Sequence, residues 1–392
     1  MKTYARYSRG DFFSGGCSGL YHLCSMLSAC LLFGAANAHA QSSVTLYGLL
    51  SVGMVYTDNA GGHGQTMMLS GPQQNPRFGL RGVEDLGGGI STLFVLENGF
   101  SLTNGTASQG GRMFGRQAYV GLSSTGFGTV TLGRQYDEIA QNIPLFQSGV
   151  VFGAFGAHVG DNDNIFNSFR FNNSIRYQST NYGGLKVAGQ FAFSNASGQF
   201  SNNSAWSIGG TYSRNAFQLA TAYSRLNHPA SVTNSGGAVD NNGYGFTSPF
   251  LASPGRQAGV ESQSVFVVAS SYALGDWVLA GIYSNAAFGY MDTTGLRLQN
   301  VEVSIRKSVT PSFLVGLGYI FTFGRYTAND AKPHYNQVNV GSDYFLSKRT
   351  DLYLDGIYQR AGGAAAVAQI YSLSPSTTKS QWTAILGIRH KF

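Results

Sequence analysis

The side chains that most often perform catalysis are sparse and scattered in this sequence. Beyond residue 40, five histidines are spread along the chain: His63, His158, His228, His334 and His390. A hydrolase needs a histidine held beside a serine or an acidic residue. His158 and Asp161 are close in sequence, but they fall within a long connecting segment, where a polar pair facing water explains them better. The pattern therefore indicates a protein that is not an enzyme.

Cofactor and metal chemistry is also weakly supported. The run Asp161-Asn162-Asp163-Asn164 places oxygen ligands at alternate positions, which faintly resembles a calcium-binding loop. It lacks the central glycine and the distal glutamate of such a loop. Gly87-Gly88-Gly89 precedes a strand pattern rather than a helix, so it does not resemble a phosphate-binding loop. We expect no metal and no cofactor.

The remaining chemistry is electrostatic. Charged residues make up only 11% of the chain and the formal net charge is +7, whereas about a quarter of residues are charged in an average soluble domain. No basic cluster interleaves with aromatic residues on one element, so the sequence does not predict a nucleic-acid partner. Such charges matter most if they line a confined path.

The elements that would position these charges are segments in which apolar residues recur at every second position. On one parity of the segment 313–323 lie Phe313, Val315, Leu317, Tyr319, Phe321 and Phe323. Gly316, Gly318 and Thr322 are among the residues on the other parity. This period of two predicts a strand with one apolar face. A strand of about ten residues, tilted by roughly 40°, spans the apolar band of an outer membrane.

The breaks between such segments alternate between short and long. Past the N-terminus no run of about 20 apolar residues predicts a membrane helix, and a closed barrel is the other fold that pairs every backbone group in lipid. Long breaks are predicted at 57–75, 137–171, 228–259 and 361–379. Counting the segments predicts an all-β fold, a transmembrane antiparallel β-barrel of sixteen strands.

Residues 1–40 are predicted to be an export signal, followed by a barrel domain at 41–392. Lys2, Arg6 and Arg9 precede an apolar stretch, Met26 to Ala36, and the pattern Ala38-His39-Ala40 predicts cleavage near Ala40. A rival lipoprotein-like box at 27–30 would leave an apolar start to the mature chain, so we prefer Ala40. All three cysteines fall within the signal (Cys17, Cys24 and Cys30), which excludes disulfides from the mature protein.

Several motifs, in order, resemble those of one known family. They are Ser43 to Gly48 (SVTLYG), Arg77 to Gly89 (RFGLRGVEDLGGG), Phe114 to Leu122 (FGRQAYVGL), Phe127 to Gln135 (FGTVTLGRQ) and Gly387 to Phe392 (GIRHKF). Together they resemble the Gram-negative general porins of the β-proteobacterial type, and the resemblance spans nearly the whole mature chain. One departure is Ser51, where family members often carry aspartate.

The resemblance implies a homotrimer in the outer membrane, in contact with its lipid and with lipopolysaccharide, that passes small hydrophilic solutes and ions. The last strand ends in a terminal phenylalanine, Phe392. This ending resembles the signal read by the outer-membrane barrel-assembly machinery, which is therefore an expected partner.

A bare barrel of this size needs something to narrow it, and we expect the connection 137–171 to do so. It contains Leu145, Phe146, Val150, Val151, Phe152 and Phe155 among glycines. Such apolar side chains have little reason to lie in an external loop. We predict that this third long loop folds into the lumen and that Asp161 and Asp163 face the opening. The alternative is an external loop that mediates trimer contacts.

Arginines are expected on the opposing wall. Arg77 and Arg81 lie on the parity opposite to the apolar residues, as does Arg176, and Arg170 lies where the loop rejoins the barrel. Arg116 resembles a family position at the constriction, but it shares the parity of the apolar residues Val120 and Leu122. A bulge would be needed to turn its side chain inward, and the same holds for Arg134. The predicted constriction set comprises Arg77, Arg81, Arg116, Arg170, Arg176, Glu97, Asp161 and Asp163.

Facing charges in a narrow passage select ions, and the basic excess favours a weak preference for anions. Alternatively, the arginines pair with Glu97, Asp161 and Asp163 and leave the pore nearly neutral. The predicted function is passive diffusion of small hydrophilic solutes; a solute-selective binding channel or an adhesin-like protein is the alternative. Loops rich in glycine, asparagine and serine favour passive diffusion.

Overall fold

The computed structural model describes residues 43–244 and 248–392. The predicted export signal, residues 1–40, lies outside the described residues. Within the described ranges the wall is built from β1 (Ser43–Ala60), β2 (His63–Ser70), β3 (Arg77–Gly87), β4 (Ile90–Gly99), β5 (Gln117–Ser124), β6 (Gly128–Gln135), β7 (Phe171–Gln178), β8 (Leu185–Ala192), β9 (Ser204–Arg214), β10 (Phe217–Asn227), β11 (Val260–Leu274), β12 (Trp277–Tyr290), β13 (Gly295–Thr310), β14 (Phe313–Tyr326), β15 (Pro333–Phe345), β16 (Thr350–Gly363) and β17 (Ser380–Lys391).

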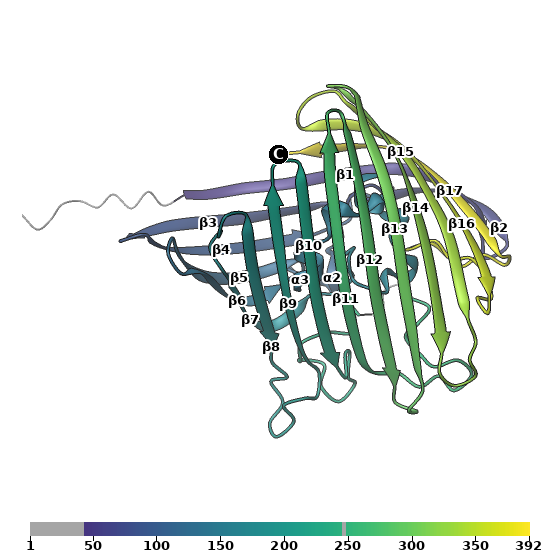
Figure 1. The fold of residues 1–392 in the computed structure, drawn as a ribbon, viewed down its shortest axis with the longest axis horizontal. Helices are drawn as coiled ribbons and strands as arrows, with labels where there is room; N and C mark the ends of the chain where they lie inside the picture. Colours follow the sequence, from purple (N-terminus) through teal and green to yellow (C-terminus); the bar gives the residue numbers. More distant parts are fainter. Residues whose placement is uncertain (1–42, 245–247) are drawn as a thin grey trace, which may run out of the picture. The chain divides into compact units, whose positions relative to one another are not determined.

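These strands form one closed antiparallel sheet (Figure 1). Closure is made by β1 and β17, which pair from Leu49 with Lys391 to Thr57 with Thr383. The other edge of β1 is shared, because β2 pairs with its second half and β3 with its first half. β2 and β3 therefore occupy a single position in the wall, which makes the predicted barrel of sixteen strands correct.

The connections differ in length at the two rims. Those at the short-turn rim include 88–89, 215–216, 275–276 and 311–312; those at the long-loop rim include 100–116, 136–170, 228–259 and 364–379. One predicted long connection, 57–75, is wrong. β1 continues to Ala60 and turns at Gly61-Gly62 into β2, with positive φ at both glycines. The tip of this hairpin, residues 57–66, holds only polar residues, glycine and alanine, so its sequence gives no strand pattern.

The two faces of the wall have opposite chemistry. Outward side chains are large and apolar, for example Leu317, Val340 and Leu354, which are 49%, 52% and 56% exposed. Inward side chains on the same sector are polar and buried, for example Asn300 and Asn339. The strands thus present apolar surface outwards, where lipid replaces water, and polar surface inwards.

Loop L3, residues 136–170 between β6 and β7, contacts the inner face of this wall. It contains α3 (Glu138–Asn142), α4 (Ser148–Val151) and three 3₁₀ turns. Phe152 lies against Gly316 and Gly341, and a Cβ atom on Gly316 would stand 1.8 Å from the ring of Phe152. The two glycines therefore leave the space that this ring fills.

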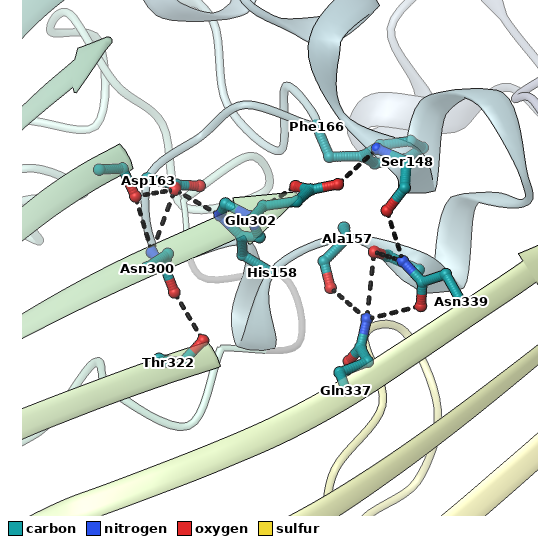
Figure 2. Close-up of polar contacts among 12 residues, drawn as sticks. Ser148, Ala157, His158, Asp163, Phe166, Asn300, Glu302, Thr322, Gln337 and Asn339 are labelled. Carbon is teal, nitrogen blue, oxygen red and sulfur yellow. Dashed lines mark hydrogen bonds and ion pairs between the residues drawn. The ribbon is translucent and has the colours of Figure 1, made fainter. Parts of the chain in front are cut away.

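A buried histidine fixes the middle of L3 to the wall (Figure 2). The Nδ1 atom of His158 lies 2.7 Å from Asp163, and its Nε2 atom lies 2.9 Å from Glu302 on β13. Ionised carboxylates only accept hydrogen bonds, so both ring nitrogens must donate and the ring is an imidazolium. Burial alone would lower the pKa of His158, but the attraction of Asp163 and Glu302 outweighs it and raises the pKa to about 10.

Further polar contacts extend this anchor along β12 to β15. Glu302 also accepts the backbone N–H of Ser148 at 2.6 Å, and Asn339 donates to Ser148 and to the carbonyl of Gly156. Asn300 donates to Asp163 at 3.1 Å. These inward side chains supply hydrogen-bond partners for a loop backbone that has no strand beside it.

The expectation that Asp161 and Asp163 face the opening is not met. Their exposed fractions are 4% and 0%. Asp161 accepts the backbone N–H groups of Phe166 and Ser168, at 2.9 and 3.1 Å, and Asp163 belongs to the histidine anchor. Burial, reinforced by the neighbouring Asp163, raises the pKa of Asp161 to about 7. Both carboxylates hold the loop together instead of lining the passage.

The packing of Phe152 generates a stability prediction. Phe152→Ala should destabilise the folded barrel by about 3–5 kcal/mol, because it removes a buried ring and leaves a cavity against two glycines. The temperature at which the folded band is lost in detergent electrophoresis should fall. Phe127→Ala is the matched control, since Phe127 is 83% exposed. Equal transition temperatures for the two variants would contradict this packing role.

The histidine anchor generates a pH prediction. Because the pKa of His158 is raised, its stabilising contribution is complete below the ordinary histidine pKa of about 6.5 and is lost as pH rises through about 10. The thermal midpoint of the wild type in detergent should therefore fall across this upper range by more than that of His158→Gln. The difference between the two proteins isolates His158, because tyrosines and lysines also titrate near pH 10. Parallel curves would refute the imidazolium assignment.

Candidate functional site

The interior of the barrel holds a series of adjoining cavities between L3 and the wall of β3 to β8. One, of about 370 Å³, is lined by Arg77, Arg116, Tyr136 and Leu145. A second, of about 440 Å³, shares Asn75, Phe166 and Asn167 with it and includes Arg170. A third, of about 180 Å³, shares Gln141 and reaches Lys186 near the short-turn rim. The shared lining residues place the three cavities next to one another, and we call the first cavity the narrow zone.

One predicted acid and one predicted arginine meet in the narrow zone. Arg116 Nε lies 2.7 Å from Glu97 Oε1, and Arg116 Nη2 donates to the hydroxyl of Tyr136 at 2.6 Å. Tyr47 donates to the other Glu97 oxygen at 3.0 Å. Glu97 is therefore neutralised by Arg116 and held by Tyr47. Arg116 precedes β5, so strand parity does not constrain it and the bulge that its inward position seemed to need is unnecessary.

Arg170 and Arg77 stand near this pair without a carboxylate of their own. The guanidinium of Arg170 lies over the ring of Tyr136, 5.3 Å from its centroid, and donates to Asn167 and to the carbonyl of Ser168. Arg77 makes no hydrogen bond or ion pair with any described residue. Burial lowers the pKa of Arg170, although arginine stays charged in proteins.

The guanidinium groups of Arg116 and Arg170 each keep one donor without a partner in the described part of the chain. Arg116 Nη1 and Arg170 Nε are buried and have no hydrogen-bond partner among the described residues. A buried donor without a partner carries a free-energy penalty that an acceptor relieves.

The structure does not bring the other predicted residues into the narrow zone. Arg81 stacks on Tyr47 at 5.5 Å. Arg176 makes two contacts to Glu138 in α3, at 2.6 and 3.2 Å, and so anchors the start of L3. Arg134 pairs with Asp240, a residue of the long connection 228–259, at 3.1 Å. Of the acids, Glu97 pairs with an arginine as the neutral-pore alternative expects, whereas Asp161 and Asp163 do not.

Sequence reasoning missed several residues of the site. Tyr136 orients Arg116 and Arg170, yet it lies in irregular chain directly after β6, where no period exists to indicate its direction. Residues 73–75, between β2 and β3, line the narrow zone because the interruption of that wall position turns them towards L3. Glu302 has inward parity between Val301 and Val303, which parity could have identified, although its partner His158 could not be.

The described part of the chain holds neither a metal-binding cluster of side chains nor a helix suited to cross a membrane. Within residues 43–244 and 248–392, no group of three or more histidine, aspartate or glutamate side chains is placed to hold a metal ion. Among the same residues, no helix is long and apolar enough to cross a membrane.

Comparison with known proteins agrees with this geometry. A model of the Gram-negative porin family matches residues 27–364. An outer membrane porin protein of Bordetella pertussis is 31% identical over 418 aligned positions, covering 94% of this chain and 99% of that protein. Outer membrane porin protein 32 of Delftia acidovorans is 27% identical and covers the same shares.

Solved structures show the same fold. The anion-selective porin from Comamonas acidovorans superposes with a TM-score of 0.71 at 23% identity, covering 90% of this chain and 100% of that one. Since the family model matches most of the chain and a relative above 30% identity spans it, the family is established. This chain belongs to the Gram-negative porin family, and it forms a passive diffusion channel in the outer membrane rather than an enzyme.

Proposed function

We propose that this porin passes small hydrophilic solutes with a weak preference for anions, and that Arg77 and Arg170 set the preference. The observation that carries the proposal is the unequal pairing of charge. Arg116 is neutralised by Glu97, whereas Arg77 and Arg170 have no carboxylate partner. Uncompensated charge of one sign in a confined, low-dielectric passage raises the local concentration of counter-ions.

The opposite side of the narrow zone supports the same reading. L3 contributes Leu145, which is 74% exposed, together with Pro144 and Gln141. The acids that would have balanced the arginines are buried inside the loop. L3 would thus narrow the passage with neutral side chains, so the field in the narrow zone is set by the arginine side. One structural relative is itself an anion-selective porin, which favours this sign.

We further propose that the mature chain starts near Gln41, after removal of the export signal, and works as a homotrimer. One structural relative is recorded in a trimer form. Phe392 exchanges two backbone hydrogen bonds with Gly48, at 3.0 and 3.1 Å, at the seam that closes the barrel. A C-terminal residue at the closing seam suits the proposed role of Phe392 in recognition by the assembly machinery.

Conductance measurements distinguish a diffusion porin from the alternative, a solute-selective channel or an adhesin-like protein. In planar bilayers the wild type should show large, ohmic openings in groups of three equal steps, because each protomer of a trimer holds one passage. Small openings that a single solute blocks would favour the selective channel instead. Single steps only would contradict the trimer.

The anion preference is tested by charge removal. The double variant Arg77→Gln/Arg170→Gln should shift the zero-current potential in a salt gradient towards that of a non-selective pore, by about twofold or more in permeability ratio. Arg225→Gln is the control: Arg225 pairs across β9 and β10 with the exposed Trp206 and so lies on the outer face. If the double variant and the control give the same zero-current potential, other groups set the selectivity.

A further inference from the structure

Two arginines face each other on the outer surface of the barrel. Arg297 on β13 and Arg325 on β14 are direct cross-strand partners, and both are exposed. They share the outward parity of Val301, Val303 and Tyr319. Like charges directly opposite each other on a sheet are destabilising, so their placement calls for a compensating anion.

The chain supplies only part of that compensation. Arg325 forms an ion pair with Asp330, and Lys332 lies 3.8 Å from the other oxygen of the same carboxylate. Arg297 has no ion pair or hydrogen bond with any described residue. We name Arg297, Arg325, Lys332 and Asp330 the rim cluster. It holds three cations and one anion, all of them exposed.

The rim cluster lies where the apolar outer face ends. β13 begins at Gly295 and β14 ends at Tyr326, so both arginines are next to the long-loop rim. From Arg325 the outward positions continue to Phe323, about 7 Å further along the strand, and then to Phe321 and Tyr319. The aromatic residues mark the edge of the hydrocarbon zone, which places the cations at the level of lipid head groups.

We propose that the rim cluster binds a phosphate group of an anionic glycolipid in the outer leaflet. Two guanidinium groups on adjacent strands can donate several charge-assisted hydrogen bonds to one phosphate. The acyl chains of the same molecule would lie along Val301, Val303 and Tyr319, which are 41%, 56% and 41% exposed. The proposal rests on the location of the family in the outer membrane and gives the lipopolysaccharide contact expected from the sequence a defined site. It is independent of the ion preference of the pore.

The test is a binding titration of the detergent-solubilised full-length porin, by native mass spectrometry in the presence of EDTA. Diphosphorylated lipid A should bind at least about tenfold more tightly than dephosphorylated lipid A. Arg297→Gln/Arg325→Gln should abolish this difference. Asp330→Asn should tighten lipid A binding, because it removes the one carboxylate that competes for Arg325. Misfolding would weaken lipid A binding in every variant. Tighter binding by Asp330→Asn, a single substitution at an exposed residue, therefore cannot be caused by misfolding.

Arg360→Gln is the matched control, because Arg360 is an exposed arginine of β16 near the same rim whose cross-strand partners are Asn336 and Ser380. It should keep the preference for diphosphorylated lipid A. The proposal fails if the double variant binds lipid A like the wild type. It also fails if Arg360→Gln loses as much of the preference for diphosphorylated lipid A as the double variant does, since any positive charge at the rim would then be enough for lipid A binding.

A last experiment adds inorganic phosphate at millimolar concentration as a competitor of lipid A. It should not displace lipid A, because it offers no acyl chains; displacement would identify a free-anion site and overturn the lipid assignment. Bilayer conductance of the double variant should equal that of the wild type, so a failed lipid test leaves the pore function untouched and a failed pore test leaves this site untouched.

Discussion

The structure depends on one constraint: a backbone N–H or C=O group in hydrocarbon must find its partner within the protein. The pairing of β1 with β17 removes the last free edges of the sheet. Once the sheet is closed, side chains of one parity contact lipid and those of the other point into the lumen. The polar lining of the passage and the apolar outer wall are both consequences of that closure.

L3 meets a related constraint, because its buried backbone groups need partners and no strand lies beside them. Its backbone and polar groups are paired by side chains, from the loop itself in the case of Asp161 and from the wall in the cases of Glu302 and Asn339. The acids of L3 are used in this way, and they are therefore withdrawn from the passage. The surplus of positive charge that we propose for the narrow zone would follow from how the loop is held, because the acids expected to pair with the arginines are buried within L3.

The arginines of this chain divide according to which face of the wall they occupy. On the inner side, Arg116 and Arg170 gather around Tyr136. On the outer side, Arg297 and Arg325 are cross-strand partners next to the long-loop rim. The inner pair does not owe its direction to strand alternation, because Arg116 precedes β5 and Arg170 lies in L3, whereas Arg297 and Arg325 take the outward parity of their strands.

The sequence by itself determined the class of fold, the number of wall positions and the face on which most strand residues lie. Alternation with period two carries that information locally, since parity is a property of each strand alone. The apolar content of L3 likewise indicated a loop that belongs against a wall rather than in water.

Only the tertiary structure decided which charges meet. Parity cannot tell that His158 lies against Glu302, or that Asp163 turns into the wall, because these contacts join residues far apart in sequence. The hairpin of β1 and β2 and the direction of Tyr136 were hidden for a related reason: neither the hairpin tip, residues 57–66, nor the chain around Tyr136 carries alternating apolar residues. Register between strands and the path of an irregular loop arise from packing over the whole barrel. A single sequence shows the two residues of such a contact, but it does not show that they touch.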